Sequence, residues 1–249
     1  MGRRDNMAFA LLRLIPPQGQ VPRSCGLLSS SARHPAADGN ISPGDDNAPA
    51  GRPLIVVFHG AMSSAGNSEP LLQALSDAGF PVVAVSYGHR GTDGLARCVE
   101  DATAHVAALL PTHRPMVLIG HSLGAWVATQ VAFDPRIMPQ VRGIIGLAGV
   151  FREPARPLSL AKRLLVRVFA GKAAAEFVSG TLAHTGIPPE AIVSAGIPVW
   201  SLRSTADTIV PLSCSALGKV HTIAGVSHAA MARVTAPVVQ WCQAIAVTQ

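Results

Sequence analysis

The segment Gly120-His121-Ser122-Leu123-Gly124 places a serine between two glycines, directly after a short apolar run. A G-x-S-x-G pattern between a strand and a helix makes a tight turn that lifts the serine hydroxyl to the first turn of that helix. The start of a helix favours developing negative charge. We therefore predict that this serine is a nucleophile, provided that a base removes its proton.

The base is expected to be a histidine that follows the serine and an acidic residue along the chain. Of nine histidines, only His184, His221 and His228 lie well beyond Ser122. We expect the side chain of His221 to pack, because it falls inside a strand pattern, and His184 lies in an irregular stretch. His228 comes just after the last apolar run, so the sequence favours His228.

An acidic residue must orient the imidazole and stabilise its charged form. Asp207 follows an apolar run and precedes His228 by enough residues for one helix and one strand. Glu153 is the alternative, but it lies among arginines and a proline, as a solvated loop residue would. The sequence therefore favours Asp207 as the acid.

Nucleophilic attack on a carbonyl creates an oxyanion that two backbone amides can stabilise. We expect one donor to be the amide of Leu123. The other should come from the segment His59-Gly60-Ala61-Met62, where Ala61 is the first choice and Met62 the second. Gly60 lets the backbone approach closely, and we expect His59 to hold the loop rather than to react.

Short apolar runs alternate with helical patterns from residue 54 onward. We expect strands at 54–58, 82–86, 117–119, 144–148, 199–204 and 220–223, and helices at 69–78, 95–110, 123–133 and 236–246. Runs that are apolar throughout are typical of a parallel sheet buried on both faces. The alternation predicts an α/β fold, a mostly parallel sheet flanked by helices, with the reactive loops at its carboxyl edge.

Residues 150–195 interrupt this alternation and are expected to form a small helical cap, with helices near 158–170 and 173–183. The stretch 151–175 holds six basic residues and one acidic residue, nearly all of the chain's net charge of +6. Apolar and basic residues alternate in its first half: Leu158, Leu160, Lys162, Arg163, Leu164, Leu165, Arg167, Val168 and Phe169. One interpretation is a cap helix packed on the core. The other is a mobile lid that contacts an anionic lipid surface or steers acidic substrates.

Residues 1–51 are rich in Pro, Gly, Ser, Asp and Asn, which predicts a flexible tail before one domain at 52–249. The apolar segment Met7–Ile15 is too short to span a bilayer. Arg3 and Arg4 resemble a twin-arginine signal, but no clear cleavage site follows. The sequence favours a cytoplasmic location over secretion.

Cys25, Cys98, Cys214 and Cys242 are widely spaced and form no CxxC pair, so we predict no metal and no thioredoxin-like site. Their spacing does not indicate whether any two are bridged. The positive charge is local, and no nucleic-acid-binding signature accompanies it, so nucleic acid is not expected as a partner.

Taken together, these motifs resemble those of the α/β-hydrolase superfamily, and within it those of bacterial lipases and esterases. The resemblance covers residues 54–246, apart from the family's leading antiparallel strands, whose absence implies a trimmed sheet. It implies a catalytic triad, an oxyanion hole and a set of supporting residues. The implied triad is Ser122, Asp207 and His228, and the implied oxyanion hole is formed by Ala61 and Leu123. The implied supporting residues are His59, Gly60, Gly120, His121 and Gly124.

The implied activity is hydrolysis of a small-molecule acyl ester or lipid through an acyl-enzyme on Ser122, with no cofactor. The same site suits acyl transfer and the hydrolysis of thioesters or amides. A non-catalytic binding module on this fold is a further alternative. The motifs select neither an acyl chain length nor an oligomeric state.

Overall fold

The computed structural model describes residues 51–154, 159–180 and 186–247. At its centre lies one sheet of six parallel strands in the order β2-β1-β3-β4-β5-β6. The strands are β1 (Leu54–Phe58), β2 (Val82–Val85), β3 (Met116–His121), β4 (Val141–Leu147), β5 (Val199–Ser204) and β6 (Lys219–Ile223). Each lies where an apolar run predicted a strand, so the expected α/β fold is confirmed.

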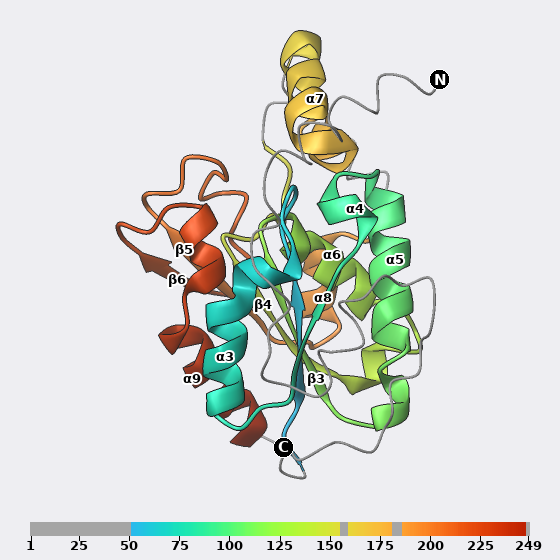
Figure 1. The fold of residues 1–249 in the computed structure, drawn as a ribbon, viewed down its shortest axis with the longest axis vertical. Helices are drawn as coiled ribbons and strands as arrows, with labels where there is room; N and C mark the ends of the chain where they lie inside the picture. The colour runs from blue at the N-terminus through green and yellow to red at the C-terminus, as the bar shows by residue number, and fades with distance from the viewer. Residues whose placement is uncertain (1–50, 155–158, 181–185, 248–249) are drawn as a thin grey trace.

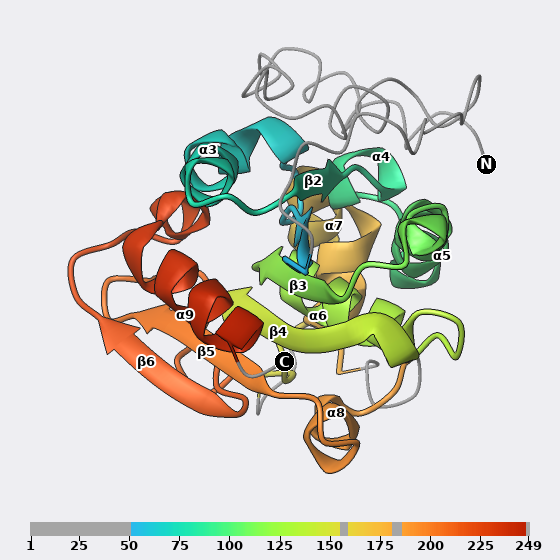
Figure 2. The same cartoon turned by 90° about the horizontal axis from the view of Figure 1, so that it is seen from below.

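Helices cover both faces of the sheet (Figure 1). They are α3 (Glu69–Asp77), α4 (Gly88–Gly91), α5 (Leu95–Ala107), α6 (Leu123–Ala132), α7 (Leu160–Phe177), α8 (Pro189–Ser194) and α9 (Ala236–Val247). Short 3-10 turns are η1 (Ala65–Ser68), η2 (Leu110–Thr112), η3 (Met138–Gln140) and η5 (Ala229–Arg233). Figure 2 shows α3 and α9 on one face and α5, α6 and α8 on the other.

The strand–helix unit formed by β3 and α6 lies in the interior of the protein. Every residue of β1, β2 and β3 is buried, and so is every residue of α6. The helix can be buried all round because its sequence LGAWVATQVA carries no charged residue. The turn between β3 and α6 therefore rests on a rigid support.

The other edge of the sheet is more open. In β6 the residues from Lys219 to Thr222 are exposed, and only Ile223 is partly covered. The expectation that the side chain of His221 packs is wrong, because His221 is exposed on β6, one of the two edge strands of the sheet. The ring of His221 instead meets that of Trp241 edge-on, with centroids 6.1 Å apart.

The expected cap region contains α7 and α8. The two helical patterns expected there correspond to the two halves of α7, which are separated by a kink at Gly171, whose positive φ (φ 91°, ψ 178°) lies outside the helical region. A Cβ at this glycine would lie 2.6 Å from Thr92, so the break lets the chain press against that residue. Leu158 and His184, named above, lie outside the described residues.

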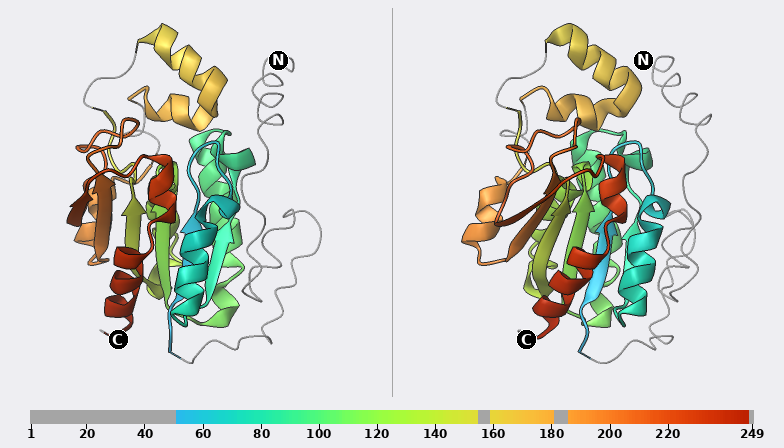
Figure 3. Two further views of the ribbon diagram at one scale, coloured as in Figure 1. Left: turned by 60° about the vertical axis from the view of Figure 1, so that its left-hand side comes forward. Right: turned by 90° about the vertical axis from the view of Figure 1, so that its left-hand side faces the viewer.

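The second half of α7 is anchored to the segment before α5. The amide of Lys172 donates to the carbonyl of Thr92 at 2.7 Å, and the carboxylate of Glu176 accepts from the amide of Leu95 at 2.8 Å. The first half of α7 extends above the carboxyl edge of the sheet (Figure 3). None of the described helices has the length and apolar character of a bilayer-spanning segment.

Candidate active site

Ser122 sits in a strained turn between β3 and α6. Its φ of 53° and ψ of −122° lie in a region that non-glycine residues rarely adopt, at a cost of about 1–3 kcal/mol. Neighbouring backbone holds it there: its amide donates to the carbonyl of Leu147 at 3.1 Å, and its carbonyl accepts from Val150 at 3.0 Å. Both partners lie at or just after the end of β4, so the sheet itself fixes the turn.

The two glycines of the turn are required by contact distances. A Cβ on Gly120 would lie 2.3 Å from the amide nitrogen of Ala125, and one on Gly124 would lie 2.4 Å from the carbonyl oxygen of Phe58. Both contacts are with backbone atoms, which cannot move aside without shifting α6 or β1. The turn therefore tolerates no larger residue at either position.

Asp207 and His228 form a hydrogen-bonded pair in the loops after β5 and β6. Oδ2 of Asp207 lies 2.8 Å from Nδ1 of His228, and the two side chains are 3% and 15% exposed. Oδ1 of Asp207 accepts the amides of Ile209 at 2.8 Å and Val210 at 3.0 Å. Because the carboxylate accepts on one side of the imidazole, the hydrogen lies on Nδ1 and Nε2 is left as an acceptor.

His121 joins the histidine loop to the serine turn. Its Nε2 donates to the carbonyl of His228 at 2.9 Å, and the two rings lie 4.9 Å apart. Since His121 precedes Ser122 in the chain, this bond brings the loop of His228 to the nucleophile turn. The structure thus gathers Ser122, Asp207 and His228 at one edge of the sheet, and Asp207 rather than Glu153 is the partner of His228.

The loop after β1 lies against the same turn. A Cβ on Gly60 would be 3.1 Å from Cβ of Ser122, so the loop backbone passes directly beside the serine. Leu123 is the first residue of α6, where a helix leaves its amide unpaired. In the part of the chain that the structure describes, the amides of Ala61 and Leu123 have no hydrogen-bond acceptor.

His59 lies beneath this loop. Its Nδ1 donates to the carbonyl of Gly60 at 2.8 Å, and its ring stacks on that of Tyr87 with centroids 4.3 Å apart. The hydroxyl of Tyr87 in turn donates to the carbonyl of His59. Burial lowers the pKa of His59 to about 4, so this ring is neutral at pH 7.

His121 is neutral for a related reason. Burial, reinforced by the neighbouring His228, lowers its pKa to about 4. A neutral ring that donates from Nε2 has an unprotonated Nδ1, and this atom is buried without a partner among the described residues. His121 therefore acts here as a hydrogen-bond donor to the backbone of His228 rather than as a charged group.

The sequence reasoning missed a buttress formed by α4. The guanidinium of Arg90 donates to the carbonyls of Met62 at 3.2 Å and Ser63 at 3.5 Å. A Cβ on Gly91 would lie 3.1 Å from the carbonyl oxygen of Gly60. The sequence does contain a pattern that could have indicated this contact. Gly88 and Gly91 enclose His89 and Arg90 shortly after β2, the strand that pairs with β1.

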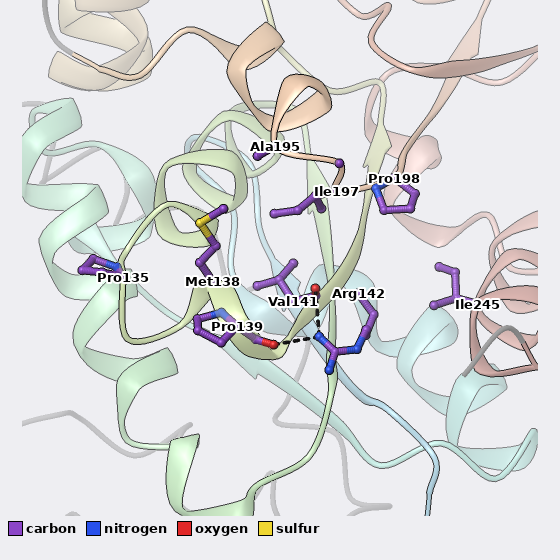
Figure 4. Close-up of a pocket in the computed structure, with 10 residues that line it drawn as sticks. Pro135, Met138, Pro139, Val141, Arg142, Ala195, Ile197, Pro198 and Ile245 are labelled. Atoms are coloured by element: carbon purple, nitrogen blue, oxygen red, sulfur yellow. Dashed lines mark hydrogen bonds between the residues drawn. The ribbon is translucent and has the colours of Figure 1, made fainter.

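A separate hollow of about 660 Å³ lies at the opposite end of the sheet, beside the starts of β4 and β5 (Figure 4). Its lining is mainly apolar and includes Met138, Ile197 and Ile245. The guanidinium of Arg142 donates to the carbonyls of Pro139 at 2.8 Å and Val141 at 3.3 Å. This lining contains no nucleophile and no acid–base pair, so we place no reaction there.

Comparison with known proteins supports the fold. A family model described as serine aminopeptidase, S33, matches residues 49–178, which include Ser122 and end before Asp207. No curated protein sequence matches the chain.

Many solved structures have a similar fold, and three of them are hydrolases or esterases from different organisms. One is a pyrethroid hydrolase from Sphingobium faniae JZ-2, at 20% identity over 78% of this chain and 97% of that one, with a TM-score of 0.54. Another is an extracellular α/β-hydrolase from a Paenibacillus species, at 16% identity over 79% and 98%, with a TM-score of 0.53. The third is the methylesterase protein MES16 from Arabidopsis, at 14% identity over 79% and 100%, with a TM-score of 0.53.

Proposed function

Because the chain belongs to the serine aminopeptidase S33 family of α/β hydrolases, we propose that it is a serine hydrolase that cleaves carboxylic esters. The family match and the fold support hydrolase activity in general. The arrangement of the site supports the proposed serine mechanism. The observation that carries the proposal is the pairing of Asp207 with His228 beside the strained turn of Ser122. The loops of Asp207 and His228 lie at the same edge of the sheet as the turn of Ser122, and the carbonyl of His228 accepts a hydrogen bond from His121, the residue before Ser122.

The proposed reaction begins with transfer of the Ser122 hydroxyl proton to Nε2 of His228 as the oxygen attacks the ester carbonyl carbon. Asp207 stabilises the imidazolium that forms. The tetrahedral oxyanion accepts hydrogen bonds from the amides of Ala61 and Leu123. His228 then gives its proton to the leaving alcohol, the ester C–O bond breaks, and an acyl-enzyme remains.

Water completes the cycle by the same route. His228 takes a proton from water as the water oxygen attacks the acyl carbon, and returns it to Ser122 Oγ as the acid product leaves. Every step uses groups of the chain itself, with Gly60, Gly120 and Gly124 providing the close backbone approach and His59 and His121 holding the two loops.

Charge beside the site favours an ester over a peptide. Cleavage at a free amino terminus, which the family description suggests, would call for a carboxylate to bind the substrate ammonium. Arg90 instead donates to the carbonyl of Met62 in the oxyanion loop and places a positive charge there, which also lowers the pKa of His59. One neighbour in fold is a methylesterase, which agrees with an ester substrate.

Substitution of the nucleophile tests the proposal. We expect Ser122→Ala to lower kcat on p-nitrophenyl esters by about 10³-fold or more, with an unchanged melting temperature. A panel from acetyl to palmitoyl esters, with thioesters and aminoacyl anilides beside them, would separate the esterase from thioesterase and aminopeptidase activity. The exposed Ser194→Ala on α8 is the control. Parent-level activity in Ser122→Ala would overturn the mechanism.

A further inference from the structure

The first half of α7, residues 160–170, carries large apolar side chains in full contact with solvent. Leu160 is 77% exposed, Leu164 62%, Leu165 56% and Phe169 61%. Single exposed apolar residues are ordinary on protein surfaces, but a group of four on three successive turns of one helix is not. This group requires a partner of some kind.

The apolar side chains share the outer side of the helix. At about 100° per residue, positions 160, 161, 164, 165, 168 and 169 fall on one half of the helix, and all six are apolar. Arg163, Val166 and Ala170 are half-buried and lie on the opposite half, so that side faces the protein. Within the apolar half Val168 is also half-buried, whereas residues 160, 161, 164, 165 and 169 are exposed. A helix that packs on a core has the reverse arrangement. The interpretation of a packed cap helix therefore fits only the second half of α7.

Cations flank the apolar half. Lys162 and Arg167 border that half and form no ion pair within the described ranges, and residues 160–170 contain no acidic residue. By contrast, Lys172 pairs with Glu176 farther along the same helix. An exposed apolar face bordered by free cations is complementary to a surface that offers both hydrocarbon and negative charge.

We propose that residues 160–170 bind the surface of an anionic lipid bilayer or micelle. The apolar half inserts at the level of the acyl chains near the headgroups, and Lys162 and Arg167 contact headgroup phosphates. The segment spans about 16 Å at 1.5 Å per residue, and it lies parallel to the surface rather than across it. Because α7 stands above the carboxyl edge, the bound orientation turns the Ser122 edge toward the lipid (Figure 3).

Vesicle sedimentation tests this without turnover, using the Ser122→Ala protein. We expect binding to vesicles that contain phosphatidylglycerol, and weaker binding to pure phosphatidylcholine or in high salt. The double variants Leu164→Ser/Phe169→Ser and Lys162→Gln/Arg167→Gln should each lower partitioning about tenfold or more. Val193→Ser on α8 and Val247→Ser on α9, which also replace exposed apolar residues, should bind as the parent does.

Each contrary outcome overturns the proposal. Absence of binding does so, and so does equal binding by the α7 variants, which would assign the contact to another part of the chain. Concentration-dependent dimerisation that Leu164→Ser/Phe169→Ser abolishes would assign this face to a second copy. With Ser122 intact, the α7 variants should keep parent activity on a soluble short ester. Failure of docking and failure of the proposed chemistry are thus measured separately.

Discussion

Two buried neutral histidines flank the nucleophile turn, and they make stability depend on pH. Their pKa values fall from 6.5 to about 4 on folding, chiefly through burial. Between these values the unfolded chain binds protons that the native protein does not, so the free energy of unfolding decreases as pH falls from about 6.5 toward 4. The loss is on the order of 3 kcal/mol per histidine at its limit, and none is expected above pH 7.

Urea unfolding at pH 7.5 and pH 5 measures this effect. We expect His59→Phe, which keeps a ring to stack on Tyr87, to show a smaller decrease between the two pH values than the parent, whatever its absolute stability. An equal decrease in both proteins would contradict the assignment of a depressed pKa to His59.

Arg90 is expected to hold the oxyanion loop in position. Arg90→Met removes two hydrogen bonds to loop carbonyls, so we expect kcat on an aryl ester to fall about ten- to a hundredfold with little change in KM. Arg142→Met is a matched control, because Arg142 also donates to two carbonyls but at the far end of the sheet. If Arg142→Met lowers kcat as much, the effect is general loss of stability.

Residues that stand in a recognisable local motif could be predicted from the sequence. Residues whose role depends on contact with a segment distant in the sequence could not. Ser122, Asp207 and His228 stand in turns that follow predicted strands, so their meeting at one edge follows from the parallel sheet. Arg90 has no local motif of this kind. Its role depends on its donating to carbonyls 28 and 27 residues away, which only the pairing of β1 with β2 brings near.

At the scale of elements, α6 fits closely against β1 and the nucleophile turn. We expect Gly124→Ala to lower the melting temperature strongly and to abolish activity, because its Cβ would lie 2.4 Å from a backbone oxygen of β1. Gly94→Ala is the control, since its Cβ would meet the flexible end of Lys172 at 3.1 Å. Thermal unfolding followed by circular dichroism compares the two. Equal stability would show that the turn can relax.

The sequence predicted long, regular elements well and short ones poorly. All six strands were located, because buried parallel strands are continuous apolar runs. The helix expected to reach residue 110 ends at Ala107, where a 3-10 turn with Pro111 follows. Helix α8 was missed because six residues are too few to show a helical period, and α4 was missed because all of its residues, Gly88–Gly91, have positive φ, which a right-handed helical pattern does not predict. The outward apolar face of α7 was also hidden, since periodicity does not say which side meets the core.

At the scale of the molecule, we expect the described cysteines to react slowly with thiol reagents, because they are buried. Cys98, Cys214 and Cys242 are free and buried, and burial raises the pKa of each thiol, to about 12 for Cys98 and Cys242. In a Cys25→Ser variant we expect a thiol reagent to label the native protein slowly and to label all three cysteines at once in urea. Rapid native labelling would mean that the core opens readily.

The three catalytic candidates lie in parts of the sheet that differ in their protection from solvent. Ser122 is held by the buried centre of the sheet, whereas Asp207 and His228 hang from loops at β5 and at the solvent-exposed border strand β6. Fraying of that border would separate the acid and the base from the nucleophile while the centre stayed folded. We expect ester hydrolysis to fade on warming before amide protons of β1 and β3 begin to exchange. The outermost strand, the least protected part of the sheet, would then set the upper temperature of activity.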